Sequence, residues 1–192
     1  MNMIVCMRDL IGEDILAGAV NGKSVFARCV SIIGDEPDQP TVLFLDFSDV
    51  VVATASALRE SVVALKAYKR SIGSNLYPVL TNINSSIEDE VQVLMDARND
   101  AIIACDLARE GSVSQIRLIG KLDPKQAMTF ELVTRLNGAD AGSLMKKFGE
   151  EEKTTSTTAW NNRLAGLVQR GLLREFTIGR SKFYRPLLEE MS

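Results

Sequence analysis

The first half of the chain contains short apolar runs separated by longer segments in which apolar residues recur every three or four positions. The run at 41–46 is almost wholly apolar, which is typical of a strand covered on both faces of a parallel sheet. Other runs lie at 3–7, 75–80 and 101–106. We predict a strand at each run, with 41–46 as the central strand. The strand at 75–80 is expected at an edge or a bulge, because Pro78 has no amide hydrogen for the ladder.

Helices are predicted between these strands. A turn is expected at 21–24, and a helix follows it as far as Gly34 because apolar residues recur at helical spacing. A second helix runs from 56 to about 70, and a capping box that begins at Ser85 starts a third. This alternation predicts an α/β fold with right-handed crossovers and a mostly parallel or mixed sheet.

A second block of the chain begins at Asp123, which is followed by Pro124 and is a strong helix start. Asn137 and Gly138 end that helix, and Asp140 occupies the N-cap position of the next one. We place the domains at 1–112 and 123–192. The segment 113–122 is expected to be a linker, with room for one more short strand.

The pattern of the last forty residues predicts a helix followed by a β-hairpin. Apolar residues from Trp160 to Leu172 fall on one helical stripe, and Gly171 is the expected left-handed stop. Beyond it, apolar and polar residues alternate on either side of a turn at 179–181, which indicates a short hairpin. One face of the helix would anchor it, and the other would be free to contact a partner.

Charge is distributed unevenly along the 192 residues. The chain has a net charge of -3, whereas 153–185 holds seven basic residues and one acidic residue, a local net of +6. Against this, the acidic run 150–152 lies just before the predicted helix, and acidic side chains near phosphates weaken binding. The turn 148–154 is also longer than the three to four residues usual in a helix-turn-helix. We expect the acidic run to point away from any nucleic acid.

The motif Arg163-Leu164, Gly171-Leu172-Leu173, Gly179-Arg180 and Tyr184-Arg185-Pro186 resembles the recognition helix and wing of winged helix-turn-helix transcription regulators. With the two preceding helices, the resemblance covers 123–192. It implies a helix in the major groove of double-stranded DNA and a wing against the adjacent backbone. The alternative is a winged helix that docks protein and never meets DNA, because the fold alone does not fix the function.

Six residues are the candidate DNA contacts. Asparagine has the donor and acceptor pair suited to an adenine edge, and a short hydroxyl can reach a base one turn earlier, whereas cationic side chains suit phosphates or a narrow minor groove. We assign base readout to Thr157, Asn161 and Asn162. We assign the phosphate contacts to Arg163, Arg180 and Lys182.

The segment 45–58 resembles the motif of STAS domains, the fold of anti-sigma-factor antagonists, and the wider pattern extends over about the first 106 residues. In those antagonists a serine at a helix start accepts a phosphate that disrupts partner docking. Here that position is Ala55, so we expect no phosphate switch. Thr54 and Ser56 keep hydroxyls at the helix start, where they could cap the helix or face an anion, and capping is the commoner role.

Asp46, in the same segment, has two readings. It could line a ligand crevice at the strand ends, or it could bond the loop that follows, and we favour the loop.

Several kinds of chemistry are not expected. The chain has no histidine, which removes Ser-His and Cys-His nucleophile pairs and the common zinc sites. It has no phosphate-binding glycine motif, and its three cysteines are isolated. We therefore predict no enzyme, no catalytic residue, no cofactor and no metal. No apolar run is long enough for a membrane span and no leader pattern is present, so we expect a cytoplasmic protein without a membrane partner.

These inferences converge on an α/β chain with a STAS-like mixed or parallel sheet, followed by a small α+β winged-helix domain. The expected function is DNA-binding transcription regulation. The STAS-like domain would form a homodimer or bind a signalling protein. The alternative is a component of a partner-switching pathway whose winged helix binds protein.

Overall fold

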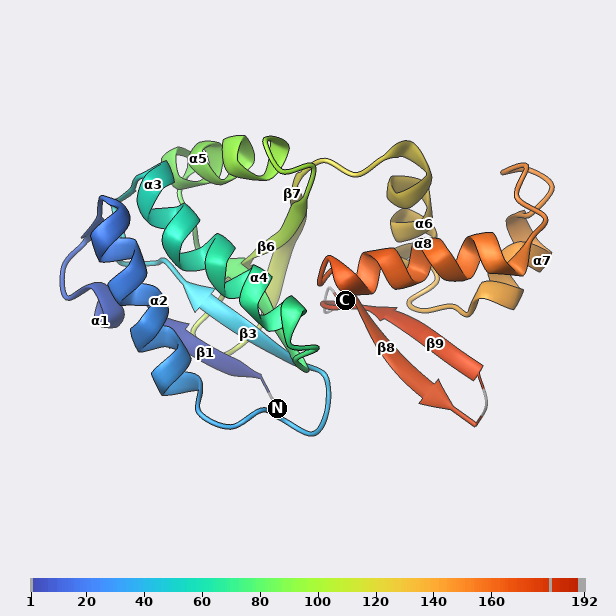
Figure 1. Cartoon of the computed structure of the whole chain (residues 1–192), viewed down its shortest axis with the longest axis horizontal. Coiled ribbons are helices and arrows are strands. Elements are labelled where there is room, and N and C mark those ends of the chain that lie inside the picture. The colour runs from blue at the N-terminus through green and yellow to red at the C-terminus, as the bar shows by residue number, and fades with distance from the viewer. Residues whose placement is uncertain (1, 180, 190–192) are drawn as a thin grey trace. The chain divides into compact units, whose positions relative to one another are not determined.

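The chain divides into two compact units, each with its own core. The computed structural model describes residues 2–179 and 181–189. Unit 1 comprises the chain up to Lys121, and unit 2 comprises Leu122–Glu189 (Figure 1). Unit 1 contains a five-stranded mixed sheet with helices, and unit 2 contains helices and a two-stranded antiparallel hairpin. The predicted mixture of helices and sheet is therefore confirmed.

The sheet of unit 1 has the strand order β1-β3-β5-β6-β7. The first four strands in this order are parallel, and β7 is antiparallel to β6. A separate parallel pair is formed by β2 and β4. The strands are β1 (Met3–Cys6), β2 (Ile15–Leu16), β3 (Thr41–Asp46), β4 (Val52–Ala53), β5 (Leu76–Thr81), β6 (Ala101–Leu107) and β7 (Val113–Gly120).

The central strand is β5, so the prediction that 41–46 would be central was wrong. The prediction that Pro78 would mark an edge or a bulge was also wrong. Pro78 pairs with Leu43 of β3, whereas β6 pairs only with Leu80 and Thr81 of β5. Pro78 therefore lies outside the ladder with β6, and this position tolerates a residue without an amide hydrogen.

The helices of unit 1 pack against one face of the sheet, where their apolar side chains join those of the strands. Leu43 and Leu45 of β3 and Leu80 of β5 share a single core with Leu58 and Val62 of the helices. One helical run changes character along its length, from an α-helix through a π-helical turn and back. The helices are α1 (Met7–Ile11), α2 (Ala19–Ile33), α3 (Ala55–Leu58), the π-helical turn η1 (Arg59–Val63), α4 (Ala64–Ser71) and α5 (Ser85–Asp96).

Two local predictions were wrong for packing reasons. The expected turn at 21–24 lies inside α2, where Gly22 allows close helix contact: a Cβ there would lie 2.4 Å from the carbonyl oxygen of Ala57. The segment 113–122 does contain a further strand, β7, as the sequence allowed, but this strand pairs with β6 and buries Ile119, so the segment is part of the sheet and not a linker. The short apolar pattern of 113–122 predicts a strand only weakly, because strand formation there depends on pairing with the neighbouring strand β6.

Unit 2 is built from α6 (Pro124–Arg135), α7 (Ala141–Phe148), α8 (Thr157–Gln169), β8 (Leu173–Ile178) and β9 (Ser181–Pro186). The predicted caps are confirmed: Asp123 accepts from the amides of Lys125 and Gln126, and Asp140 accepts from that of Ser143. An isolated antiparallel bridge joins Ala139 to Tyr184. The core of unit 2 includes Leu132, Val133, Leu144, Trp160, Leu164, Leu167 and Tyr184.

Candidate nucleic-acid interface

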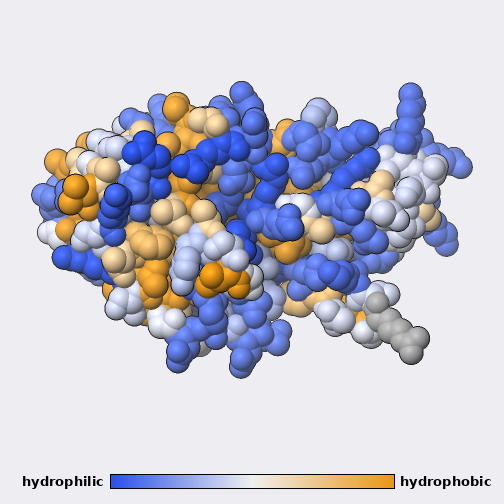
Figure 2. Space-filling view, viewed as in Figure 1, coloured by the Kyte–Doolittle hydropathy of each residue, from blue (hydrophilic) through white to orange (hydrophobic). Residues whose placement is uncertain are grey.

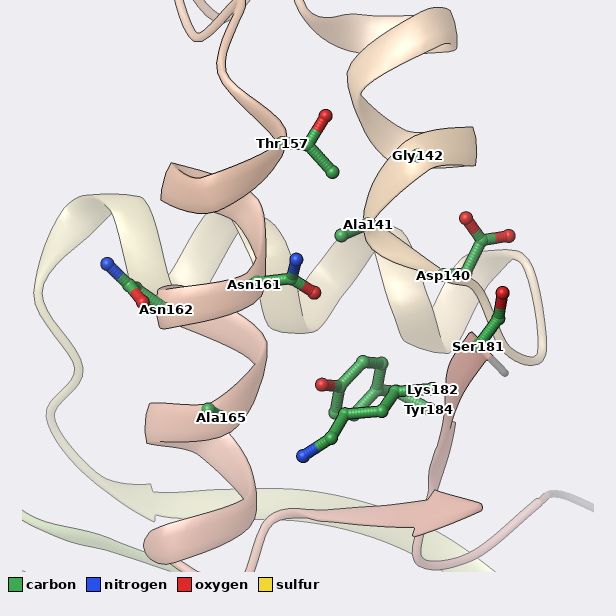
Figure 3. A pocket seen from close by; sticks show the side chains of 10 residues that line it. All are labelled: Asp140, Ala141, Gly142, Thr157, Asn161, Asn162, Ala165, Ser181, Lys182 and Tyr184. Carbon is green, nitrogen blue, oxygen red and sulfur yellow. The ribbon is translucent and has the colours of Figure 1, made fainter. Parts of the chain in front are cut away.

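Unit 2 contains a groove of about 600 Å³ between α8, the first turn of α7 and β9. It brings together residues that are as far apart in the sequence as Asp140 and Tyr184 (Figure 3). From here on it is called the α8–β9 groove. It is lined by Asp140, Ala141, Gly142, Thr157, Asn161, Asn162, Ala165, Ser181, Lys182 and Tyr184.

One line of α8 forms a wall of this groove. Thr157, Asn161 and Ala165 are spaced four residues apart, so they lie on the same side of the helix. The opposite side is anchored by buried apolar residues, among them Trp160 and Leu164. Because the core fixes the rotation of the helix, the polar line is held outward over the groove.

The two asparagines differ in direction. In Figure 3 the side chain of Asn161 points into the space between α8 and α7, whereas that of Asn162 leaves the other side of α8. Both residues are exposed, and neither is hydrogen-bonded to the residues that the structure describes. Their amides therefore remain available to a ligand, with Asn161 the better placed of the two.

The first turn of α7 forms the second wall. The Asp140 carboxylate accepts from the Ser143 amide at 2.9 Å and from the Ser143 hydroxyl at 2.6 Å. The Ser143 hydroxyl, above all, lowers the pKa of Asp140, so this carboxylate is ionised near neutral pH. Beside it, the small residues Ala141 and Gly142 keep the backbone of α7 close to the groove surface.

Strand β9 supplies the cation. Lys182 Nζ lies 2.9 Å from Glu175 Oε1, and this hydrogen bond raises the pKa of Lys182. Tyr184 is buried beneath it, and burial, followed by the charge of Glu175, raises the pKa of Tyr184. The groove therefore contains an ammonium that is charged at any physiological pH and already has one anionic neighbour.

Arg163, predicted to contact phosphate, is instead used inside unit 2. Its Nη2 donates to Thr154 Oγ1 at 2.8 Å, and its guanidinium lies 5.0 Å from the centroid of the Trp160 ring. Trp160 Nε1 donates to the Thr154 carbonyl oxygen at 2.8 Å. Arg163 follows Trp160 by three residues on α8, so its long side chain extends back over the Trp160 ring. Arg163 holds the segment before α8 and does not line the groove.

The expected basic patch is divided between surfaces. Arg174 and Arg185 pair across the hairpin on the face that also carries Phe176 and Phe183, whereas Lys182 is on the groove face. Arg180 lies outside the described residues. Counting charges along a hairpin cannot separate its two faces, because adjacent residues of a strand point to opposite sides. Among the described basic residues, Lys182 is the one that lines the groove.

The acidic run before α8 lies in a compact turn. The amides of Glu152 and Lys153 donate to the carbonyl oxygens of Phe148 and Glu150, and Lys153 has a left-handed φ of 49°. Among the described residues that line the groove, none comes from this run. The long turn expected between 148 and 154 is therefore present, and its backbone is internally bonded.

Thr54 and Ser56 belong to unit 1, whereas the groove is formed by residues of unit 2. Thr54 is the N-cap of α3 by position, but its side chain makes no capping hydrogen bond. Its Oγ1 instead accepts from the Gly18 amide at 3.2 Å and lies 3.2 Å from Ser56 Oγ. The prediction that the Thr54 side chain caps α3 was wrong, because its hydroxyl accepts from the Gly18 amide at the start of α2 and not from an amide of α3. Thr54 links the starts of α2 and α3.

Within residues 2–179 and 181–189, no group of three or more histidine, cysteine, aspartate or glutamate side chains could hold a metal ion. Burial raises the pKa of Cys29 to about 11 and that of Cys105 to about 12, so both thiols stay protonated and weakly nucleophilic. In the same part of the chain, every helix is too short or too polar to cross a membrane.

No model of a known protein family matches the sequence, and no curated protein matches it.

Proposed function

We propose that the chain is a DNA-binding transcription regulator in which unit 2 is a winged helix-turn-helix. In this proposal α8 is the recognition helix, β8 and β9 form the wing, and double-stranded DNA is the partner. The order of elements supports it: a helix, a short bridging strand at Ala139, two further helices and a hairpin that bridges back through Tyr184. That order is the one expected of a winged helix.

The observation that carries the proposal is the convergence of Thr157, Asn161 and Lys182 on one groove (Figure 3). Thr157 and Asn161 belong to the N-terminal half of α8, the part of a recognition helix that meets base edges. Lys182 comes from the hairpin, from which a cation can reach the phosphate backbone. Polar groups for bases and a cation for phosphate thus lie side by side.

DNA binding can be measured with the full chain by fluorescence anisotropy on labelled duplexes at several salt concentrations. We expect the logarithm of affinity to fall linearly with the logarithm of salt concentration, as phosphate neutralisation releases counterions. Lys182→Ala should weaken binding to all sequences alike and lower the salt slope by about one unit. A full chain that folds but has no salt-dependent affinity for any duplex would overturn the proposal.

For unit 1 we propose a STAS-like domain that forms a homodimer or binds a signalling protein. Its exposed apolar side chains support a role in protein contacts: apart from Ile178, the large exposed apolar residues that are described all belong to unit 1. Orange patches over the helices of unit 1 in Figure 2 mark part of this surface. Val20 is 82 % exposed, and the parallel pair Ile15 and Val52 is exposed at 45 % and 39 %.

The homodimer follows from the DNA proposal, because a single winged helix buries little surface and operators usually contain two half-sites. Sedimentation at micromolar concentration, with and without a duplex, measures it directly. We expect a dimer in at least one of these conditions. A monomer in both would leave the signalling partner as the role of unit 1.

A protein-docking role for unit 2 is the second candidate. The separation of Lys182 from Arg174 and Arg185 supports it, since the groove itself carries few cations. In that case the full chain would bind no duplex at any salt concentration. Substituting Asn161 would then weaken a protein complex isolated with the chain.

A further inference from the structure

The groove face of the hairpin carries an anion as well as a cation. In the register of β8 and β9, Glu175 is opposite Tyr184, and Thr177 is opposite Lys182. Glu175 and Lys182 are therefore diagonal neighbours on one face of the hairpin, within reach of each other. Their side chains are 27 % and 59 % exposed, so solvent reaches both, and Lys182 lines the groove.

The Glu175 carboxylate is paired with Lys182, the cation that the proposed function assigns to phosphate. Lys182 Nζ is 2.9 Å from Glu175 Oε1, a normal length for a charge-assisted hydrogen bond. An ammonium has three hydrogen-bond donors, and one of them is directed to Glu175. A phosphate that approaches Lys182 must displace this carboxylate or lie beside it, and two anions at such short range repel each other.

We infer that Glu175 acts as an internal competitor for the ammonium of Lys182 and so limits the affinity of the α8–β9 groove for the DNA backbone. This inference rests on the proposed DNA-binding function. The competition acts on phosphate contacts, which are independent of sequence, and leaves the base contacts of α8 untouched. Glu175 thereby weakens binding to all duplexes and makes recognition depend more on the residues that meet base edges.

The test compares two charge-neutralising variants of the full chain, Glu175→Gln and Glu131→Gln. Glutamine keeps the shape of the side chain and removes one negative charge. Glu131 is exposed on α6 and does not line the groove, so Glu131→Gln controls for the change in net charge alone. Circular dichroism melting confirms that each variant is folded, and anisotropy with a labelled duplex of mixed sequence reports affinity at several salt concentrations.

We expect Glu175→Gln to tighten binding about three- to fivefold at low salt, which is the scale of an exposed charge pair. The salt slope should steepen by at most about 0.9, the value for one added phosphate contact. Glu131→Gln should change affinity less than twofold, about the limit for a distant exposed charge. In a Lys182→Ala background, Glu175→Gln should lose most of its effect on affinity, because the ammonium for which Glu175 and phosphate compete is absent.

The outcomes separate this inference from the proposed function. If the unmodified chain binds duplexes but Glu175→Gln and Glu131→Gln behave alike, the competition is overturned and DNA binding stands. The competition is also overturned if Glu175→Gln acts equally with and without Lys182. If neither the unmodified chain nor Glu175→Gln binds any duplex, both the competition and the proposed function fail.

Discussion

Polar side chains at the strand ends of unit 1 bond one another, whereas Asn161 in the α8–β9 groove of unit 2 has no hydrogen-bond partner among the described residues. The Asp46 carboxylate accepts from the Ser48 amide at 3.2 Å, from the Ser48 hydroxyl at 3.0 Å and from Asn82 Nδ2 at 2.8 Å. Asn82 Oδ1 in turn accepts from the Leu107 amide. The predicted loop-bonding role of Asp46 is thus confirmed, since these contacts close the loop that follows β3.

The asparagines of the groove have no such partners among the described residues. Asn161 and Asn162 are exposed on α8 and make no hydrogen bond there. A polar group engaged by its own fold stabilises that fold, whereas one that faces a concave surface without a partner is free for a ligand. The difference teaches that residue type alone does not mark a binding site, because asparagine is bonded within the fold at Asn82 and has no described partner at Asn161.

The largest expected effect is a loss of stability when a side chain on the buried side of α8 is removed. Trp160→Ala removes a side chain that is 0 % exposed and its hydrogen bond to Thr154, so the free energy of unfolding of unit 2 should fall by about 3 to 5 kcal/mol. Thr158→Ala, at an exposed position of the same helix, is the control. Urea unfolding of the full chain followed by circular dichroism measures both. A small loss for Trp160→Ala would mean that the apolar side of α8 does not anchor the helix.

The next effect tests the internal bonds of unit 1. Asp46→Ala leaves the Ser48 amide and one Asn82 donor without their carboxylate, so the free energy of unfolding should fall by about 2 kcal/mol. Asp49→Ala, at an exposed position of the same loop, should change it by less than about 0.5 kcal/mol. Thermal and urea unfolding both report the difference. Equal losses for the two variants would contradict a role for these bonds in stability.

The asparagines provide the direct comparison. Asn161→Ala should leave the free energy of unfolding nearly unchanged and cost about 1 to 3 kcal/mol of binding on a preferred duplex only. Asn82→Ala should lower the free energy of unfolding and leave DNA binding nearly unchanged, because Asn82 bonds Asp46 and the backbone at Leu107. Selection from random duplexes, followed by anisotropy, supplies the preferred site. A stability loss for Asn161→Ala without a change in binding would break the comparison.

The smallest effect concerns the start of α3. Ser56→Ala removes a hydroxyl that is bonded only to Thr54 among the described side chains, so the free energy of unfolding should fall by about 1 kcal/mol or less. Thr54→Ala should cost more, since it also removes the acceptor of the Gly18 amide. We expect no phosphate on either hydroxyl. Phosphopeptide mass spectrometry of the protein from cells would contradict this by finding one.

The sequence by itself determined the local features of the fold. Asp123 and Asp140 were identified as caps because a short acceptor before an apolar helical run has few other uses. Gly171, with φ of 70°, ends α8 as expected, and the alternation beyond it forms the predicted hairpin. Thr157 and Asn161 could be predicted on the outward side of α8 because the buried stripe of the helix fixes which side faces outward.

Tertiary structure decided the features that depend on distant neighbours. The place of β5 at the centre of the sheet depends on where β6 pairs, and Gly22 lies inside a helix because the backbone at Ala57 is close. Arg163 is held by Thr154 and Trp160, and Lys182 is paired with Glu175. Charge and propensity are properties of single residues, whereas these outcomes depend on which side chains the completed fold places within a few ångströms of each other.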